Sequence, residues 1–243
     1  MSRDELKRLG VAQRDPAVTL LALVPLALLH LGLRAGTQLE TFFLVESALD
    51  GIGRLAEIGL WLALVVGLLW AIGRIRQLKL AWAGAGAMIL LEGLVWALVL
   101  GPGLSFLTRW LPLETAPLIL GMPLQETATV WNKLAIAAGA GVYEELLFRG
   151  LGLGGLALLL RTLFRRVAAP LTADRLSFLL ALLLSSAAFA LAHGLHGHTE
   201  AFEVDILTFR ILAGLAFGLL YAFRGLAVAA YSHFAYDALY LLT

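Results

Sequence analysis

Long apolar runs dominate this sequence, most of them close to the ~20 residues that an α-helix needs to cross a bilayer. They lie at about residues 17–33, 55–73, 80–101, 133–160, 176–193, 206–223 and 226–242. The runs are rich in Leu, Ala and Gly and do not alternate with polar residues, so helices fit them and a membrane β-barrel does not. We therefore predict an all-α fold, a polytopic transmembrane helix bundle of about seven spans, in a range of roughly six to eight.

Composition supports the bilayer as the solvent of this chain. Hydrophobic residues make up 60% of the 243 positions and charged residues only 14%, far from the balance of a soluble globular domain. No repeat, linker or soluble domain interrupts the runs. We expect a single integral membrane domain over residues 1–243, with N-terminal spans in 1–130 and a functional core in 131–243. The run 133–160 is long for one helix, and glycines at 150, 152, 154 and 155 could break it into a span and an interfacial piece.

Loop charges predict the orientation of the bundle. Cytoplasmic loops are enriched in Lys and Arg. One side of the predicted bundle has only four of these residues, namely Arg34, Arg54, Arg109 and Lys133. The other side has twelve, namely Arg3, Lys7, Arg8, Arg14, Arg74, Arg76, Lys79, Arg161, Arg165, Arg166, Arg175 and Arg224. We expect an integral protein of a bacterial inner (plasma) membrane with a cytoplasmic N-terminus.

The charge and the cysteine content of the chain limit the kinds of partner and catalytic group that it can have. The net charge is +1 and the chain has no long basic tract, so nucleic acid is not the expected partner. The chain has no cysteine, which excludes disulfides, thiolate nucleophiles and thiolate metal ligands. The groups left for chemistry are histidines and carboxylates.

Charged side chains at membrane depth are unfavourable by roughly 2.5 to 3.5 kcal/mol each, so each one calls for a reason. The first cluster is Glu144, Glu145 and Arg149. Arg149 follows Glu145 by four residues and can pair with it on one helix face. Glu144 is then left as a candidate general base. The alternative is that all three residues form a structural ion-pair network between helices.

Two further clusters lie on later spans. Phe189 precedes His193 by four residues, and His233 precedes Asp237 by the same spacing. A single histidine in such a position is more often structural, but acids, an arginine and histidines on three spans favour convergence on one catalytic site. His196 and His198 fit no zinc motif and are left outside this site. Glu92 lies within the third predicted span, where it can line a cavity or pair with Arg210, a polar outlier in the sixth. Both are also near enough to the ends of their spans to extend to the interface, and this structural role is favoured.

These three motifs resemble the CAAX prenyl protease and bacteriocin-processing (CPBP) family of intramembrane proteases. The resemblance rests on Glu144-Glu145-x-x-x-Arg149, Phe189-x-x-x-His193 and His233-x-x-x-Asp237, in this order on successive spans. It implies that Glu144 and His193 activate a water, that Glu145 and Arg149 hold the site together, and that His233 and position 237 stabilise the oxyanion. The family usually has asparagine where this chain has Asp237, so the role of Asp237 stays open.

The resemblance implies hydrolysis of a peptide bond in or near the C-terminal tail of a membrane-associated substrate. That substrate would be a membrane-anchored or translocated polypeptide, cut at mid-bilayer or toward the outer face. Glu144, His193 and His233 could bind zinc with an open water position. A metal-free, glutamate-type site is favoured, because the residues lack a compact HExxH-type pairing. One alternative is a catalytically silent scaffold or bacteriocin-immunity protein of the same fold. A transporter is a weaker alternative, because the sequence has no inverted repeat.

Overall fold

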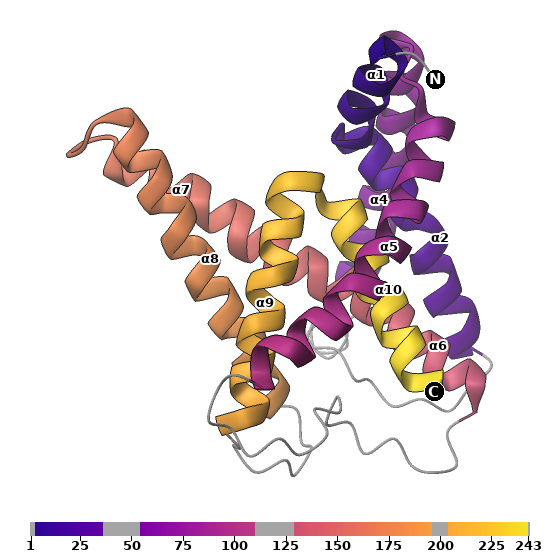
Figure 1. The fold of residues 1–243 in the computed structure, drawn as a ribbon. Helices are drawn as coiled ribbons and strands as arrows, with labels where there is room; N and C mark the ends of the chain where they lie inside the picture. The colour runs from indigo at the N-terminus through magenta and orange to yellow at the C-terminus, as the bar shows by residue number, and fades with distance from the viewer. Residues whose placement is uncertain (1–2, 36–53, 110–128, 196–203, 243) are drawn as a thin grey trace.

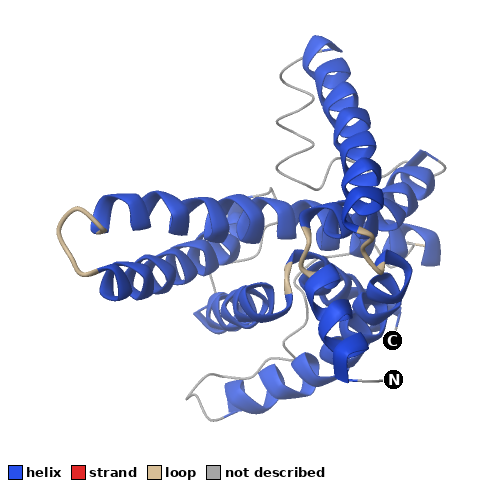
Figure 2. Ribbon diagram, turned by 90° about the horizontal axis from the view of Figure 1, so that it is seen from above, coloured by secondary structure: helices blue, strands red, loops and turns tan. Residues whose placement is uncertain are grey.

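The computed structural model describes residues 3–35, 54–109, 129–195 and 204–242, and all regular structure in these ranges is helical (Figure 2). The elements are α1 (Arg3–Gln13), α2 (Pro16–Ala35), α4 (Arg54–Leu78), α5 (Trp82–Arg109), α6 (Val130–Gly139), the π-helix η1 (Ala140–Gly155), α7 (Leu156–Phe164), α8 (Pro170–Leu195), α9 (Val204–Arg224) and α10 (Leu226–Leu242). The all-α prediction is confirmed. The two ends of the chain lie at opposite ends of the bundle (Figure 1).

Five helical segments among the described residues are long and apolar enough to cross a membrane. They are Pro16–Arg34, Trp82–Leu107, Val130–Phe164, Pro170–His193 and Val204–Arg224. Each corresponds to one of the predicted runs. The other two predicted runs fall on helices α4 and α10, which are outside this set of five. The chain is thus a polytopic helical membrane protein.

Residues 130–164 form one continuous helical stretch, in which α6, η1 and α7 follow one another without a loop. The expected break at the glycines is therefore wrong. The glycines instead allow close packing: a Cβ on Gly154 would lie 2.6 Å from the Tyr221 hydroxyl of α9, and a Cβ on Gly152 would lie 3.4 Å from the Cβ of Ser185 on α8. Neighbouring helices pack where side chains are missing, and the hydrogen bonding of the stretch continues.

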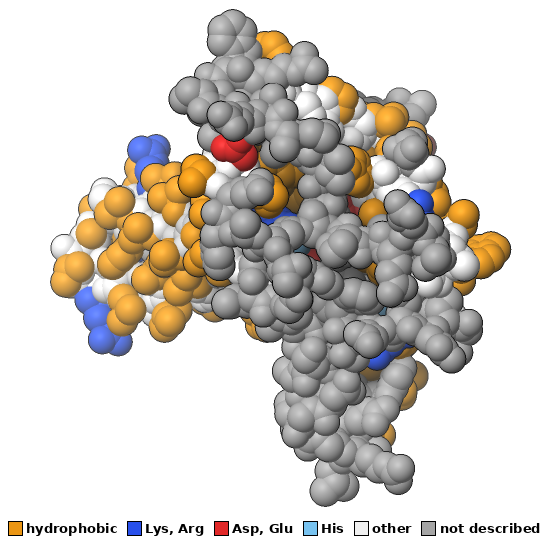
Figure 3. Space-filling model, turned by 90° about the horizontal axis from the view of Figure 1, so that it is seen from below, with side chains coloured by type: hydrophobic (Ala, Val, Ile, Leu, Met, Phe, Trp, Pro, Cys, Tyr) orange, Lys and Arg blue, Asp and Glu red, His pale blue; other side chains and the backbone are white. Residues whose placement is uncertain are grey.

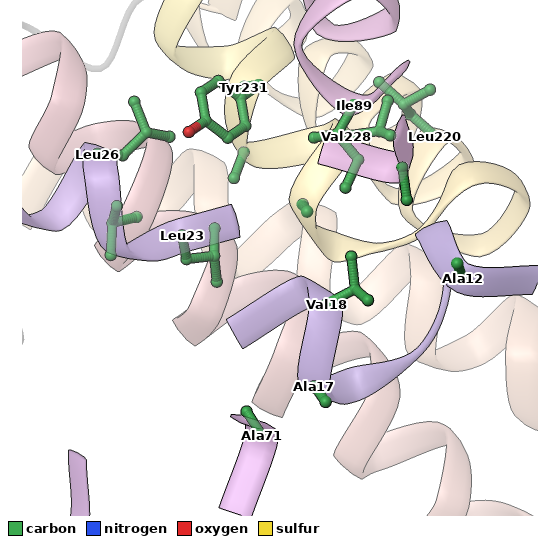
Figure 4. Packing of buried hydrophobic residues seen from close by; sticks show 14 of the residues in the cluster. Ala12, Ala17, Val18, Leu23, Leu26, Ala71, Ile89, Leu220, Val228 and Tyr231 are labelled. Carbon is green, nitrogen blue, oxygen red and sulfur yellow. The ribbon is translucent and has the colours of Figure 1, made fainter. Parts of the chain in front are cut away.

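Helix α10 lies at the centre of the bundle, in contact with α2, α5, α6, α9 and η1. Residues 227–233 of this helix are buried, and Val228 and Tyr231 pack with Val18 of α2 and Ile89 of α5 in the main hydrophobic cluster (Figure 4). Close approach depends on glycine: a Cβ on Gly93 would lie 2.6 Å from the Cβ of Tyr231. The helix that carries His233 and Asp237 is thereby held on several sides.

Polar side chains join α1, α5 and α9 at the end of the bundle that carries the N-terminus. Glu92 pairs with Arg224 and accepts a hydrogen bond of 3.0 Å from Gln13 Nε2. The expected pairing of Glu92 with Arg210 is therefore wrong, because Arg224 lies at the C-terminal end of α9, level with Glu92, whereas Arg210 lies near the N-terminal end. Glu92 stabilises the helix ends and takes no part in the candidate site.

The α7–α8 hairpin projects sideways from the bundle (Figures 1 and 2). Seen from below, this arm is covered with hydrophobic side chains (Figure 3), among them the exposed Leu158, Leu179 and Leu183. Near its tip Arg161 and Arg165 pair with Asp174 at 2.8 and 3.0 Å. An apolar surface flanked by charges at one end is typical of a membrane-embedded hairpin with an interfacial tip.

Candidate active site

The structure brings all the predicted site residues together where η1, α8 and α10 meet. Glu144, Glu145 and Arg149 come from η1, Phe189 and His193 from α8, and His233 and Asp237 from α10. The contacts of His233 with both glutamates join η1 to α10, and the contact of His193 with Glu144 joins α8 to them. Three motifs far apart in the sequence thus form one cluster.

Glu145 is the centre of the buried part of this cluster. Its Oε1 lies 2.8 Å from Arg149 Nη1 and 2.7 Å from His233 Nδ1. The side chains of Glu145 and Arg149 are 0% and 1% exposed. A buried carboxylate of this kind is tolerated only when it is paired. The predicted pairing of Glu145 with Arg149 is present, and it also fixes the ring of His233, whose Nδ1–H donates to the carboxylate.

Two phenylalanines surround the guanidinium of Arg149. Its Cζ lies 4.4 Å from the centre of the Phe189 ring and 5.3 Å from that of Phe217, within the range of cation–π attraction. Arg149 Nη2 also reaches the backbone carbonyl of Gly214 at 3.5 Å. Phe217 stacks on His233 as well, with ring centres 4.7 Å apart and an interplanar angle of 21°. Arg149 is therefore committed to holding the helices together.

His193 is oriented by its own helix. Its Nδ1 lies 2.8 Å from the carbonyl oxygen of Phe189. Since a carbonyl oxygen only accepts, Nδ1 carries the proton, and in the neutral ring Nε2 is then an acceptor. That Nε2 faces Glu144, with 3.8 Å between it and Oε2.

Glu144 lies between the two histidines. Its Oε2 is 3.8 Å from His193 Nε2 and 3.8 Å from His233 Nε2, and its side chain is 13% exposed. These distances are too long for direct hydrogen bonds. They suit a water that bridges two polar groups across more than 3.5 Å. Glu144 Oε2 is also a buried oxygen without a hydrogen-bond partner in the described part of the chain, so a small polar ligand would satisfy it.

Asp237 lies close to the same nitrogen of His233 as Glu144 does. Its Oδ2 lies 3.5 Å from His233 Nε2, and its side chain is 3% exposed. The predicted spacing of one helical turn is thus present in α10. Asp237 contacts His233, and no contact with His193 is found among the described residues.

Sequence reasoning did not connect helix α9 with this cluster: Gly214 and Phe217 contact Arg149 and His233, and Arg210 lies on the same helix. A Cβ on Gly214 would lie 2.9 Å from the Cβ of Ser186, so α8 and α9 touch there. The signal for this contact was the Gly214-x-x-x-Gly218 spacing, which is typical of closely packed membrane helices. Nothing in the sequence distinguishes Phe217 from the other aromatic residues.

Histidines and carboxylates are the side chains of this protein that could hold a metal ion. His196 and His198 lie outside the described residues. Within the described ranges, no group of three or more His, Cys, Asp or Glu side chains is arranged to hold a metal ion. Glu144, His193 and His233, the residues named for zinc, converge but do not form such a group as they stand.

Comparison with known proteins places this cluster in a family. Residues 126–239 match the family model described as Type II CAAX prenyl endopeptidase Rce1-like. No curated protein and no solved structure matches the chain significantly. The matched residues contain the three motifs and every residue of the cluster described above. Together with the apolar helices, the match supports a membrane protease that acts on a membrane-associated polypeptide. Residues 126–239 therefore match the CPBP family of CAAX-protease-like intramembrane proteins.

Proposed function

We propose that this protein is a glutamate-type intramembrane endopeptidase that hydrolyses a peptide bond in or near the C-terminal tail of a membrane-associated polypeptide. One observation carries the proposal: a buried oxygen of Glu144 lies 3.8 Å from Nε2 of both His193 and His233. A carboxylate between two imidazoles is suited to bind, orient and deprotonate one water molecule.

In the proposed reaction, the water binds between Glu144 and His193. His193 Nε2 accepts one of its hydrogen bonds, because Nδ1 already donates to the Phe189 carbonyl. Glu144 takes a proton from the water while the water oxygen forms a bond to the scissile carbonyl carbon. The carbonyl oxygen becomes an oxyanion, and a hydrogen bond to it that strengthens in the transition state accelerates this step.

His233 supplies that hydrogen bond in the proposal. Glu145 accepts from Nδ1–H at 2.7 Å. In the proposal His233 is doubly protonated, with Glu144 and Asp237 also beside it, so that its Nε2–H points toward the reaction. The carbon–nitrogen bond then breaks, and the leaving amine takes the proton that Glu144 carries. The products are a carboxylate and an amine, and water is the only co-reactant. Asp237 acts as a positioning residue beside His233. The proposal assigns no step to a metal, because a carboxylate can act as the general base by itself.

We also propose a cytoplasmic N-terminus and a site reached from the opposite side. His193 lies two residues before the end of α8, at the end of the bundle away from α1 (Figure 1). The distribution of Lys and Arg supports a non-cytoplasmic location for that end. A substrate tail that is membrane-anchored or translocated meets this requirement.

The test is cleavage of membrane-anchored tail peptides by the purified protein in lipid vesicles, with Glu144→Gln as the variant. Loss of the base should lower kcat by about 10²- to 10⁴-fold. Glu92→Gln, which changes a carboxylate outside the site, is the matched control and should keep kcat near the wild-type value.

Two outcomes would contradict the proposal. Full activity of Glu144→Gln would remove the general base. Loss of wild-type cleavage on addition of a chelator, with recovery on addition of zinc, would replace the glutamate-type mechanism by a metal-dependent one. If no tail is cleaved but tails still bind, the catalytically silent scaffold becomes the better function.

A further inference from the structure

The tip of the α7–α8 hairpin has an excess of positive charge. It spans residues 161–175 and contains four arginines and a single acid, Asp174. The whole chain, by contrast, has a net charge of only +1. Basic side chains are visible on both flanks of the apolar arm in Figure 3. Three uncompensated positive charges therefore gather at the end of a mostly apolar projection.

The four arginines are not equivalent. Arg161 Nε and Arg165 Nη2 lie 2.8 and 3.0 Å from the carboxylate of Asp174, and these contacts tie the end of α7 to the start of α8. Arg166 and Arg175 are exposed, and neither side chain has a partner within the part of the chain that the structure describes. Asp174 thus holds the hairpin closed, and two guanidinium groups remain available to a ligand.

Exposed apolar side chains lie between these two arginines in the sequence. Val167 follows Arg166 directly and is 84% exposed, and Leu171 is 62% exposed. Such side chains are unfavourable in water and favourable against lipid chains. Basic residues that extend toward headgroups while apolar neighbours reach the acyl chains are typical of segments at a membrane interface. The tip therefore has both the charge and the apolar surface that contact with lipid requires.

Helix α8 places this tip at a membrane surface. It runs from Pro170 to Leu195 without a break, and its 26 residues span about 39 Å. The hydrocarbon core of a bilayer is about 30 Å thick, so the two ends of α8 reach its two faces. The outer part of the arm projects away from the bundle (Figure 1). Lipid therefore surrounds it, and the headgroup layer faces its arginines.

We propose that the hairpin tip binds anionic phospholipid, with Arg166 and Arg175 at the phosphate group and with Val167 and Leu171 against the acyl chains. The guanidinium group matches the oxygens of a phosphate, with which it forms charge-assisted hydrogen bonds. The net positive charge of the tip selects a lipid with a net negative charge over a zwitterionic one. This lipid site does not depend on the proposed proteolytic function.

The experiment measures which lipid contacts the tip. The chain has no cysteine, so Ala169→Cys provides a single labelling site for a fluorophore there. The labelled full-length protein is placed in vesicles of phosphatidylcholine and phosphatidylglycerol, with one of the two lipids brominated so that it quenches the fluorophore on contact. The anionic phosphatidylglycerol should be preferred by roughly 5- to 25-fold, because each arginine near an anionic surface contributes about fivefold.

Two double variants at the tip test the arginines in the same assay. Arg166→Gln/Arg175→Gln should remove most of the preference for phosphatidylglycerol. Arg166→Lys/Arg175→Lys keeps both charges and should retain most of it. If the lysine variant loses as much as the glutamine variant, the arginines have a structural role in the hairpin and the inference is overturned.

A matched control separates a local site from the overall charge of the surface. Arg76→Gln/Lys79→Gln removes two exposed positive charges at the end of α4 and in the turn that follows it. The loop charges assign these residues to the same side of the membrane as the hairpin tip. This control should leave the preference at the tip unchanged. An equal loss in the control and in the glutamine variant of the tip overturns the inference, and so does a wild type without a preference.

Discussion

Replacing Glu145 with glutamine removes the only carboxylate in contact with Arg149 among the described residues, without changing the size of the side chain. The guanidinium would then be left 1% exposed without its counter-charge. Breaking a buried ion pair in this way is destabilising by about 3–5 kcal/mol. The middle of that range lowers the ratio of folded to unfolded protein by about a thousandfold.

An ion pair on the exposed hairpin tip provides the control. Asp174 pairs with Arg161 and Arg165, and the three side chains are 37%, 45% and 43% exposed. Because solvent screens such pairs, Asp174→Asn should lower the free energy of unfolding by only about 0–1 kcal/mol. The assay is reversible unfolding in mixed micelles with increasing SDS, followed by circular dichroism for both variants.

A double variant separates charge from packing. In Glu145→Leu/Arg149→Leu no buried charge is left unpaired, so the loss of stability should be much smaller than the sum of the two single losses. The reasoning is refuted if Glu145→Gln is no more destabilising than Asp174→Asn, or if the losses of the double variant are additive. Either result would mean that the Glu145–Arg149 contact contributes little to stability.

Two further predictions concern other parts of the bundle. Gly93→Ala should lower the free energy of unfolding by about 1–3 kcal/mol, because the new Cβ would lie 2.6 Å from the Cβ of Tyr231. Gly86→Ala on the same helix is the control. Its Cβ meets nothing within 4 Å, so this variant should be neutral or stabilising by up to about 1 kcal/mol. The hydrogen bonds from Arg74 hold the pKa of Asp15 below its usual value, so this pair should stabilise the fold above about pH 4 and lose its effect as the pH falls further. The stability difference between wild type and Asp15→Asn, measured from pH 6 to pH 3, should therefore shrink toward the acid end, and a constant difference would contradict this account.

The sequence predicted the helical fold and the candidate site for the same physical reason. In a chain of apolar runs, each acid, arginine or histidine at membrane depth is conspicuous, and helical spacing shows which of them share a face. The pairing of Glu145 with Arg149 follows from their separation of four residues alone. The contact of His233 with Glu145, across 88 residues of sequence, followed only from the expectation that charged groups converge.

Other features depend on three-dimensional packing that periodicity does not encode. Glu92 could be recognised from the sequence as a polar outlier. Its pairing with Arg224 depends on how α5 and α9 are aligned in the bundle, which the sequence does not show. The glycines of η1 have the composition of a helix break, yet they are contact points for α8 and α9. Phe217 resembles the other aromatic residues in the sequence, and only its stacking on His233 connects it with the site.

Because η1 is a π-helix, the number of residues in this segment determines which way its side chains point. Glu144, Glu145 and Arg149 all lie in residues 140–155, where the backbone follows a wider turn than in an α-helix. Deleting one residue there would rotate everything that follows by about a quarter of a turn relative to what precedes it, since a π-helix has more residues per turn than the 3.6 of an α-helix. Such a deletion would move Arg149 away from the phenylalanine rings even if every functional side chain were kept. In this stretch, deletion of a residue should therefore be tolerated much less well than substitution of a residue outside the candidate site.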